Sequence, residues 1–127
     1  MYDQAFGNIP EIIIPAAEEK HTRHARHLYA IALNIEKLKI DRNQFLQALQ
    51  KEGIGSGIHF TPLHLHKYYR QTGYKQGDFP NSEFIGNRTI SLPLSPALTN
   101  KDIKDVIAAI TKLINFPGTK IVFLMVC

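Results

Sequence analysis

The densest group of chemically active side chains lies at residues 59–70, which read HFTPLHLHKYYR. Histidines donate hydrogen bonds to phosphate oxygens and exchange protons near neutral pH, and lysine and arginine bind the same oxygens more strongly. Because Pro62 restricts the backbone after an expected strand, the group could face an anionic ligand. Composition alone nevertheless favours a simpler interpretation, in which His64 and His66 form local hydrogen bonds within a loop.

Metal, phosphate-loop and nucleophile sites have weaker support. The chain has six histidines, but no cysteine pair or acidic cluster completes a zinc sphere, and His21, His24 and His27 do not converge on one face. The glycine run at 53–57 leads into an expected strand and lacks the Lys-Ser/Thr of a P-loop. Cys127 is terminal, and no serine lies in a G-x-S-x-G motif. We therefore predict no metal ligand and no catalytic residue in this chain.

Charge and cysteine content narrow the classes of protein. Among 127 residues, 15 are basic and 11 acidic, a net charge of +4, and the basic residues are interleaved with acids rather than gathered in a stripe. This mild excess does not indicate a nucleic-acid partner. The longest apolar run, residues 121–127, is far shorter than the roughly 20 residues that span a bilayer. A single cysteine excludes an intrachain disulfide and fits a reducing cytoplasm.

Among the elements that must position the histidine-rich group, two helices have strong sequence signals. Asp41 and Gln44 form a capping-box pattern before a helix that ends at Gly53, and Thr99 begins a helix with an apolar stripe that runs to Ile114. Around them we predict strands at 27–33, near 57–61 and at 89–92, the last half-buried, and short helices within 63–74 and 82–87. Residues 1–26 are expected to be irregular, and the tail at 116–127 has strand character.

This order of elements predicts an α+β fold. The simplest arrangement is a two-layer α/β sandwich, in which a small antiparallel or mixed sheet is covered by helices.

Several motifs in register resemble the C-terminal region of the DegT/DnrJ/StrS sugar aminotransferases. The likeness begins with the run GIGSGIHFTPLH at 53–64, preceded by RNQFLQAL at 42–49. It continues through YYR at 68–70, GY at 73–74, GDFP at 77–80, Glu83 and SLPLSP at 91–96, and covers about His27 to Ile114. Because the motifs are separate and keep the same order, together they are more specific than any one of them.

The resemblance implies the small C-terminal domain of a fold-type-I aminotransferase. Such enzymes are homodimers that transfer an amino group, usually from glutamate, to a keto-sugar attached to a nucleotide, using pyridoxal phosphate on a lysine of the large domain. By position, His59, Phe60 and His64 would contact the substrate, with histidine hydrogen bonds to phosphate or sugar oxygens. Arg88 could meet a carboxylate of the amino donor, although a surface arginine is the favoured interpretation.

The departures from the family pattern concern the cofactor. The S-x-H-x-x-K type of segment that would supply the lysine is absent, and Lys67 and Lys75 lie in polar surroundings. We therefore predict that residues 1–26 lead in from a large domain, that 27–115 form the small domain, and that 116–127 are an extra tail. The chain is expected neither to bind pyridoxal phosphate nor to catalyse by itself. The alternative is a stand-alone binding module for an anionic ligand such as a nucleotide sugar.

Overall fold

The computed structural model describes residues 1–116 and 118–119. Its sheet has three antiparallel strands in the order β1 (Ile12–Ile13), β2 (Tyr29–Leu33) and β3 (Thr89–Leu92). The helices are, in chain order, α1 (Tyr2–Phe6), α2 (Arg42–Lys51), α3 (Lys67–Gln71), α4 (Pro80–Gly86) and α5 (Asn100–Asn115), with 3-10 turns η1 (Ile35–Lys37) and η2 (Leu63–Leu65). An α+β fold built on a small antiparallel sheet is therefore confirmed.

The central strand β2 pairs with both other strands and contributes side chains to the hydrophobic core. Its alternate residues Tyr29, Ile31 and Leu33 are buried, and it pairs with β3 so that Ile31 lies opposite Ile90. All four residues of β3 are buried, which corrects the half-buried strand expected from its alternation. At Ser91 the reason lies on the other edge of β3, where Gly57 pairs with Ser91 in an isolated bridge and brings a loop against this polar position.

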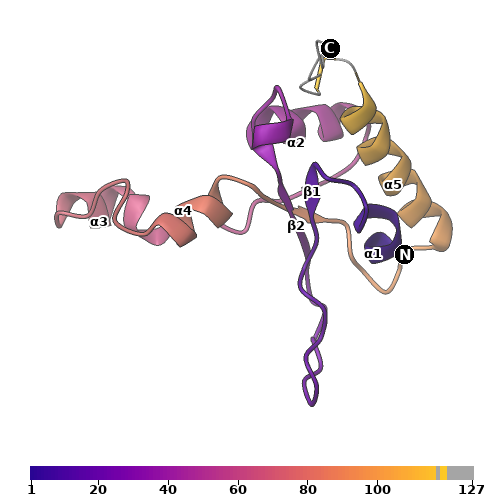
Figure 1. Cartoon of the computed structure of the whole chain (residues 1–127), viewed down its shortest axis with the longest axis horizontal. Helices are drawn as coiled ribbons and strands as arrows, with labels where there is room; N and C mark the ends of the chain where they lie inside the picture. The colour runs from indigo at the N-terminus through magenta and orange to yellow at the C-terminus, as the bar shows by residue number, and fades with distance from the viewer. Residues whose placement is uncertain (117, 120–127) are drawn as a thin grey trace, which may run out of the picture.

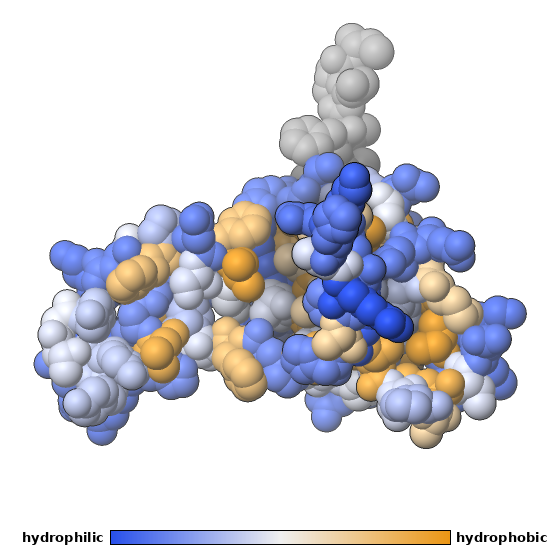
Figure 2. All heavy atoms as spheres, turned by 90° about the horizontal axis from the view of Figure 1, so that it is seen from below, coloured by the Kyte–Doolittle hydropathy of each residue, from blue (hydrophilic) through white to orange (hydrophobic). Residues whose placement is uncertain are grey.

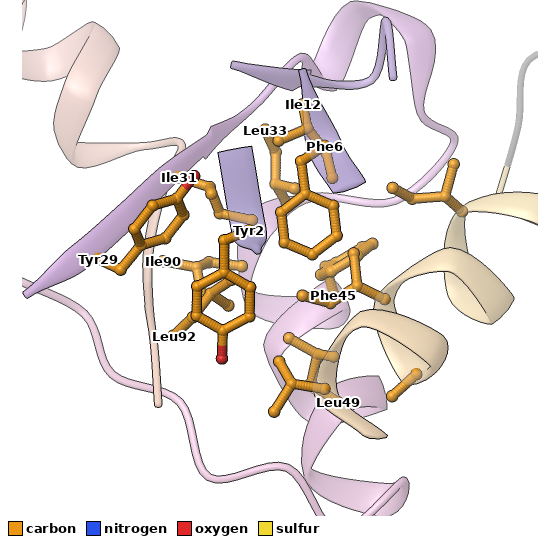
Figure 3. Packing of buried hydrophobic residues seen from close by; sticks show 14 of the residues in the cluster. Tyr2, Phe6, Ile12, Tyr29, Ile31, Leu33, Phe45, Leu49, Ile90 and Leu92 are labelled. Atoms are coloured by element: carbon orange, nitrogen blue, oxygen red, sulfur yellow. The ribbon is translucent and has the colours of Figure 1, made fainter. Parts of the chain in front are cut away.

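Helices α2 and α5 form where their sequences predicted them. Each begins with a complete capping box, Asp41 with Gln44 for α2 and Thr99 with Asp102 for α5, so their first backbone amides are satisfied. Both helices pack against the sheet together with α1, and Figure 3 shows their apolar side chains meeting those of the strands. After α2, Gly53 takes a left-handed conformation with φ of 78°.

The N-terminal segment contributes to this core, so the expectation that residues 1–26 are irregular is wrong for two parts of it. Tyr2 and Phe6 of α1 and Ile12 of β1 are all buried among the core residues. Tyr2 stacks on Phe6 and its hydroxyl donates to the carbonyl of Pro93, 2.9 Å away. The assignment of this segment to a larger domain, and the division of the chain at residue 27, stay predictions.

We call the three-stranded sheet, together with α1, α2 and α5, the body. Two projections extend from it (Figure 1). One is the loop at 14–28 between β1 and β2. The other, which we call the arm, comprises residues 61–88 with η2, α3 and α4. The hydrophobic core takes none of its residues from 55–89 among the parts of the chain that the structure describes. The strand predicted near 57–61 is wrong: only the single bridge at Gly57 forms before the arm begins.

The tail predicted as a strand falls mostly on 117 and 120–127, outside the described residues. Of the remainder, Thr119 is buried and its carbonyl accepts a hydrogen bond of 2.7 Å from the amide of Lys39. Over the described part of the chain, each helix is too short or too polar to cross a membrane.

Candidate functional site

His59 lies at the junction between body and arm, on an exposed loop. Its Nδ1 is 2.8 Å from the hydroxyl oxygen of Ser91, and the backbones of Ser91 and Gly57 exchange hydrogen bonds of 2.8 and 3.1 Å. Ser91 therefore holds both the imidazole and the loop that carries it. Nε2 of His59 has no hydrogen-bond partner among the described residues, so it is available to a ligand oxygen.

Gly57 is needed for this placement. A Cβ built at position 57 would lie 2.8 Å from Cε1 of His59, closer than side-chain atoms normally approach. A larger residue would therefore displace the imidazole from Ser91. Next along the chain, Phe60 is 73% exposed, and its ring meets the His59 ring edge to face with centroids 4.8 Å apart. The pair presents a hydrogen-bonding nitrogen beside an apolar face.

The structure separates His64 from this pair. Its imidazole is buried, and Nε2 donates to Oε1 of Glu83 at 2.8 Å. The same carboxylate oxygen accepts from the amide of Gly77 at 2.7 Å. These hydrogen bonds, led by that from His64, hold the pKa of Glu83 below its usual range. We call this group of three residues the clasp, because it joins η2, the turn after α3, and α4.

His66 is exposed and makes the local contact expected of a loop residue. Its Nε2 lies 3.4 Å from the carbonyl oxygen of Thr61. The neighbouring Lys67 and Arg70 on α3 are also exposed. The structure thus places the histidines of the predicted group in three different settings: a junction at 59, a buried clasp at 64 and a solvated loop at 66.

An open cavity of about 290 Å³ on the arm was not predicted from the sequence. Its lining is dominated by apolar and aromatic side chains: Leu63, His64, Tyr69, Tyr74, Phe79 and Ser82. We call it the aromatic cup. Among its lining residues, the rings of His64 and Phe79 have centroids 4.9 Å apart. The sequence did contain a signal for such a cavity, namely the many aromatic residues between 60 and 84. The arm is too small to bury all of them.

Arg88 corrects a second expectation, since it is a buried residue and not a surface arginine. Its guanidinium donates to both carboxylate oxygens of Glu36, at 2.6 and 2.5 Å, and stands 4.1 Å from the centre of the Phe84 ring. The hydrogen bonds from Arg88 lower the pKa of Glu36 to about 2. Both Nη atoms are therefore used within the chain, and Nε is buried without a partner, so the guanidinium offers no exposed edge to the carboxylate of an amino donor.

No residue set for a cofactor lysine or a metal emerges from the described residues. Every lysine among them is exposed, Lys67 and Lys75 included, whereas a lysine that holds pyridoxal phosphate requires an enclosed setting. Within the same residues, histidine, cysteine, aspartate and glutamate nowhere gather in threes at metal-binding distance.

Comparisons with known proteins agree on one family. Residues 1–111 match the DegT/DnrJ/EryC1/StrS aminotransferase family. The chain is 47% identical over 116 residues to MJ1066 of Methanocaldococcus jannaschii. The matched segment covers 91% of this chain and 30% of MJ1066. It is 41% identical over 115 residues to the spore coat polysaccharide biosynthesis protein SpsC of Bacillus subtilis, covering 89% of this chain and 29% of SpsC.

The fold is also similar to that of solved aminotransferase structures. The structure of DesV from S. venezuelae superposes with a TM-score of 0.79 at 23% identity, over 91% of this chain and 29% of DesV. The solved neighbours are aminotransferases of fold type I, which confirms the expected fold class. In each comparison the chain spans about 30% of the protein that it matches.

Proposed function

Because the chain belongs to the DegT/DnrJ/EryC1/StrS aminotransferase family, we propose that it is the substrate-positioning domain of an enzyme that aminates a nucleotide-linked keto-sugar. The observation that carries this proposal is the exposed pair His59 and Phe60, held at the junction by Ser91. Support for a sugar as the substrate comes from SpsC, whose name places it in polysaccharide biosynthesis.

The proposed roles follow from the two side chains. Nε2 of His59 donates a hydrogen bond to a phosphate or sugar oxygen, while Ser91 fixes the ring orientation through Nδ1. The exposed ring of Phe60 supplies an apolar face for the sugar or base. His64 stays a prediction as a substrate contact. Since Glu83 occupies its Nε2, such a contact would use Nδ1 or the ring itself.

Amino transfer in this family depends on pyridoxal phosphate, which supplies the electron sink for the exchange of the amino group. The exposed lysines of the described residues do not fit that cofactor. We therefore assign this chain binding and orientation only, and assign the chemistry to a lysine-bearing part that lies in the remaining 70% or so of the length of its relatives. The chain alone is inactive under this proposal.

The setting proposed for the complete enzyme is a cytoplasmic homodimer that uses glutamate as amino donor. Nucleotide-linked sugars as substrates and a chain with a single cysteine support the cytoplasmic location.

A chimera tests the proposal. This chain replaces the matching 115-residue segment of SpsC, and the chimera is loaded with pyridoxal phosphate. The absorbance of the bound cofactor then follows two half-reactions, one with glutamate and one with a panel of nucleotide-linked keto-sugars. We expect His59→Ala to raise the half-saturating sugar concentration about tenfold, by loss of a charge-assisted hydrogen bond, while the glutamate half-reaction keeps its rate.

His66→Ala is the matched control, because His66 is exposed and, within the described residues, its ring forms a hydrogen bond with the carbonyl of Thr61 in its own loop. It should leave both half-reactions unchanged. Equal effects of the two substitutions, or an effect of His59→Ala on glutamate alone, would contradict the proposed role. The isolated chain, titrated calorimetrically with the same sugars, should release no measurable heat; clear binding would instead support the stand-alone module.

A further inference from the structure

The arm exposes many large apolar side chains to solvent. Tyr68 is 69% exposed, Leu63 62% and Ile85 57%, and the rings of Tyr74, Phe79 and Phe84 are each nearly half exposed. Figure 2 shows apolar side chains along the face of the arm that is seen from below. So many large apolar side chains exposed on one short segment indicate an interaction site, because their contact with water is unfavourable.

This surface is held in one shape by the arm's own contacts. The clasp ties α4 to η2 and to the turn at Gly77. At the root, Gly86 packs so closely on the ring of Pro62 that a Cβ there would come within 2.5 Å. The aromatic cup, which shares His64 with the clasp, is therefore preorganised, and this reduces the entropy lost when a partner binds.

The chemistry of the cup favours a protein over a nucleotide. None of its lining residues is a lysine or an arginine, so the phosphates of a nucleotide would find no cation there. Tyr68, Phe84 and Ile85 do not line the cup and are exposed as well, so a ligand confined to the cup would leave them uncovered. A broad apolar face with a central aromatic socket is typical of a protein interface.

The length of the relatives identifies the occupant. About 70% of MJ1066 and of SpsC lies outside the segment that this chain matches, and that remainder must bury some face of the matching segment. We infer that the arm is this face: the aromatic cup accepts an apolar side chain from the lysine-bearing part of the enzyme, and Leu63, Tyr68, Phe84 and Ile85 surround the contact. The inference rests on the proposed function only in naming the partner.

Cysteine labelling in the SpsC chimera tests the inference. In a background without other cysteines, including Cys127→Ser, single cysteines are placed on the arm by Leu63→Cys or Ile85→Cys, and on exposed helix positions of the body by Gln47→Cys or Lys104→Cys. Labelling rates with a maleimide are compared between the isolated chain and the chimera. We expect a fall of about tenfold or more at both arm positions and less than about twofold on the body.

Four results would overturn the inference: equal labelling of arm and body, protection of the body alone, slower arm labelling when a nucleotide sugar is added to the isolated chain, or failure of the graft to fold in both SpsC and MJ1066. Cofactor absorbance separates this test from that of the proposed function. A chimera that protects the arm but never exchanges an amino group supports the docking and refutes the function. A chimera that exchanges amino groups while its arm stays accessible to the maleimide supports the function and refutes the docking.

Discussion

The buried imidazole of His64 donates to the carboxylate of Glu83, nineteen positions further along the chain, at 2.8 Å. The contact closes the arm upon itself, because the same oxygen also receives the amide of Gly77. A histidine from a motif associated with substrate thus does structural work in this chain. It fixes the segment that begins immediately after the exposed pair His59 and Phe60.

The clasp predicts a local effect of substitution at Glu83. Glu83→Gln exchanges a charged acceptor for a neutral one, so the amide of Gly77 and the amides of α4 should exchange with solvent about tenfold faster. Amides of β2 should keep their rates, since the arm contributes nothing to the core in the described residues. Asn81→Ala, on an exposed position of the same helix, is the control. Unchanged exchange at Gly77 would show that the clasp does not hold the arm.

The ion pair between Arg88 and Glu36 predicts a dependence of stability on acid. Because the pKa of Glu36 falls from 4.5 to about 2 on folding, chiefly through the hydrogen bonds from Arg88, its contribution is complete above about pH 4.5 and is lost as the pH falls towards 2. The free energy of unfolding of wild type should therefore exceed that of Glu36→Gln at pH 6, and the two should converge near pH 2.

Comparison with a second glutamate isolates this effect. Glu19→Gln alters an exposed carboxylate and should leave the difference from wild type constant across the same range. Other carboxyls whose pKa is lowered, Glu83 and Asp102, remain in every protein compared and cancel in the differences. A gap between wild type and Glu36→Gln that persists at pH 2 would contradict the assignment.

Truncation of Phe6 tests whether the N-terminal segment belongs to the core. The Phe6 side chain is fully buried, so Phe6→Ala should lower the free energy of unfolding by about 3–5 kcal/mol in urea titrations. Gln4→Ala changes an exposed residue of the same helix and should cost well under about 1 kcal/mol. Similar costs for the two substitutions would mean that α1 does not pack as described.

Two glycines separated by one residue, Gly55 and Gly57, offer a matched pair of substitutions at the junction. Gly57→Ala would place a methyl group against the His59 ring and break its contact with Ser91, whereas nothing lies within 4 Å of a methyl at Gly55. In the chimera, Gly57→Ala should therefore weaken sugar binding about as much as His59→Ala does, and Gly55→Ala should leave it unchanged. If both alanines are tolerated, the orientation of His59 has no role in binding.

The sequence predicted the elements whose signals are local. Helices α2 and α5 were predicted because a capping box and an apolar stripe lie within each of them. The five-residue helix α1 was missed because it has no capping side chain and is too short to show a period. Its formation depends on packing against residues far along the chain, such as Pro93.

The candidate site shows the same division. The exposed loop at His59 was found through a motif, but the burial of His64 and Arg88 was not, because their partners Glu83 and Glu36 lie 19 and 52 positions away. No period or spacing in one sequence connects such pairs. The aromatic cup forms only when η2, α3 and α4 fold together, so composition could indicate excess aromatic surface but not its shape.

The isolated bridge between Gly57 and Ser91 has a consequence for changes in the length of the arm. It brings together the chain that enters the arm and the strand that follows it, and the contact of Gly86 with Pro62 closes the root a second time. Insertions or deletions within 63–85 can therefore be accommodated without shifting the register of β3. The two contacts at the root therefore separate the geometry of the sheet from that of the arm.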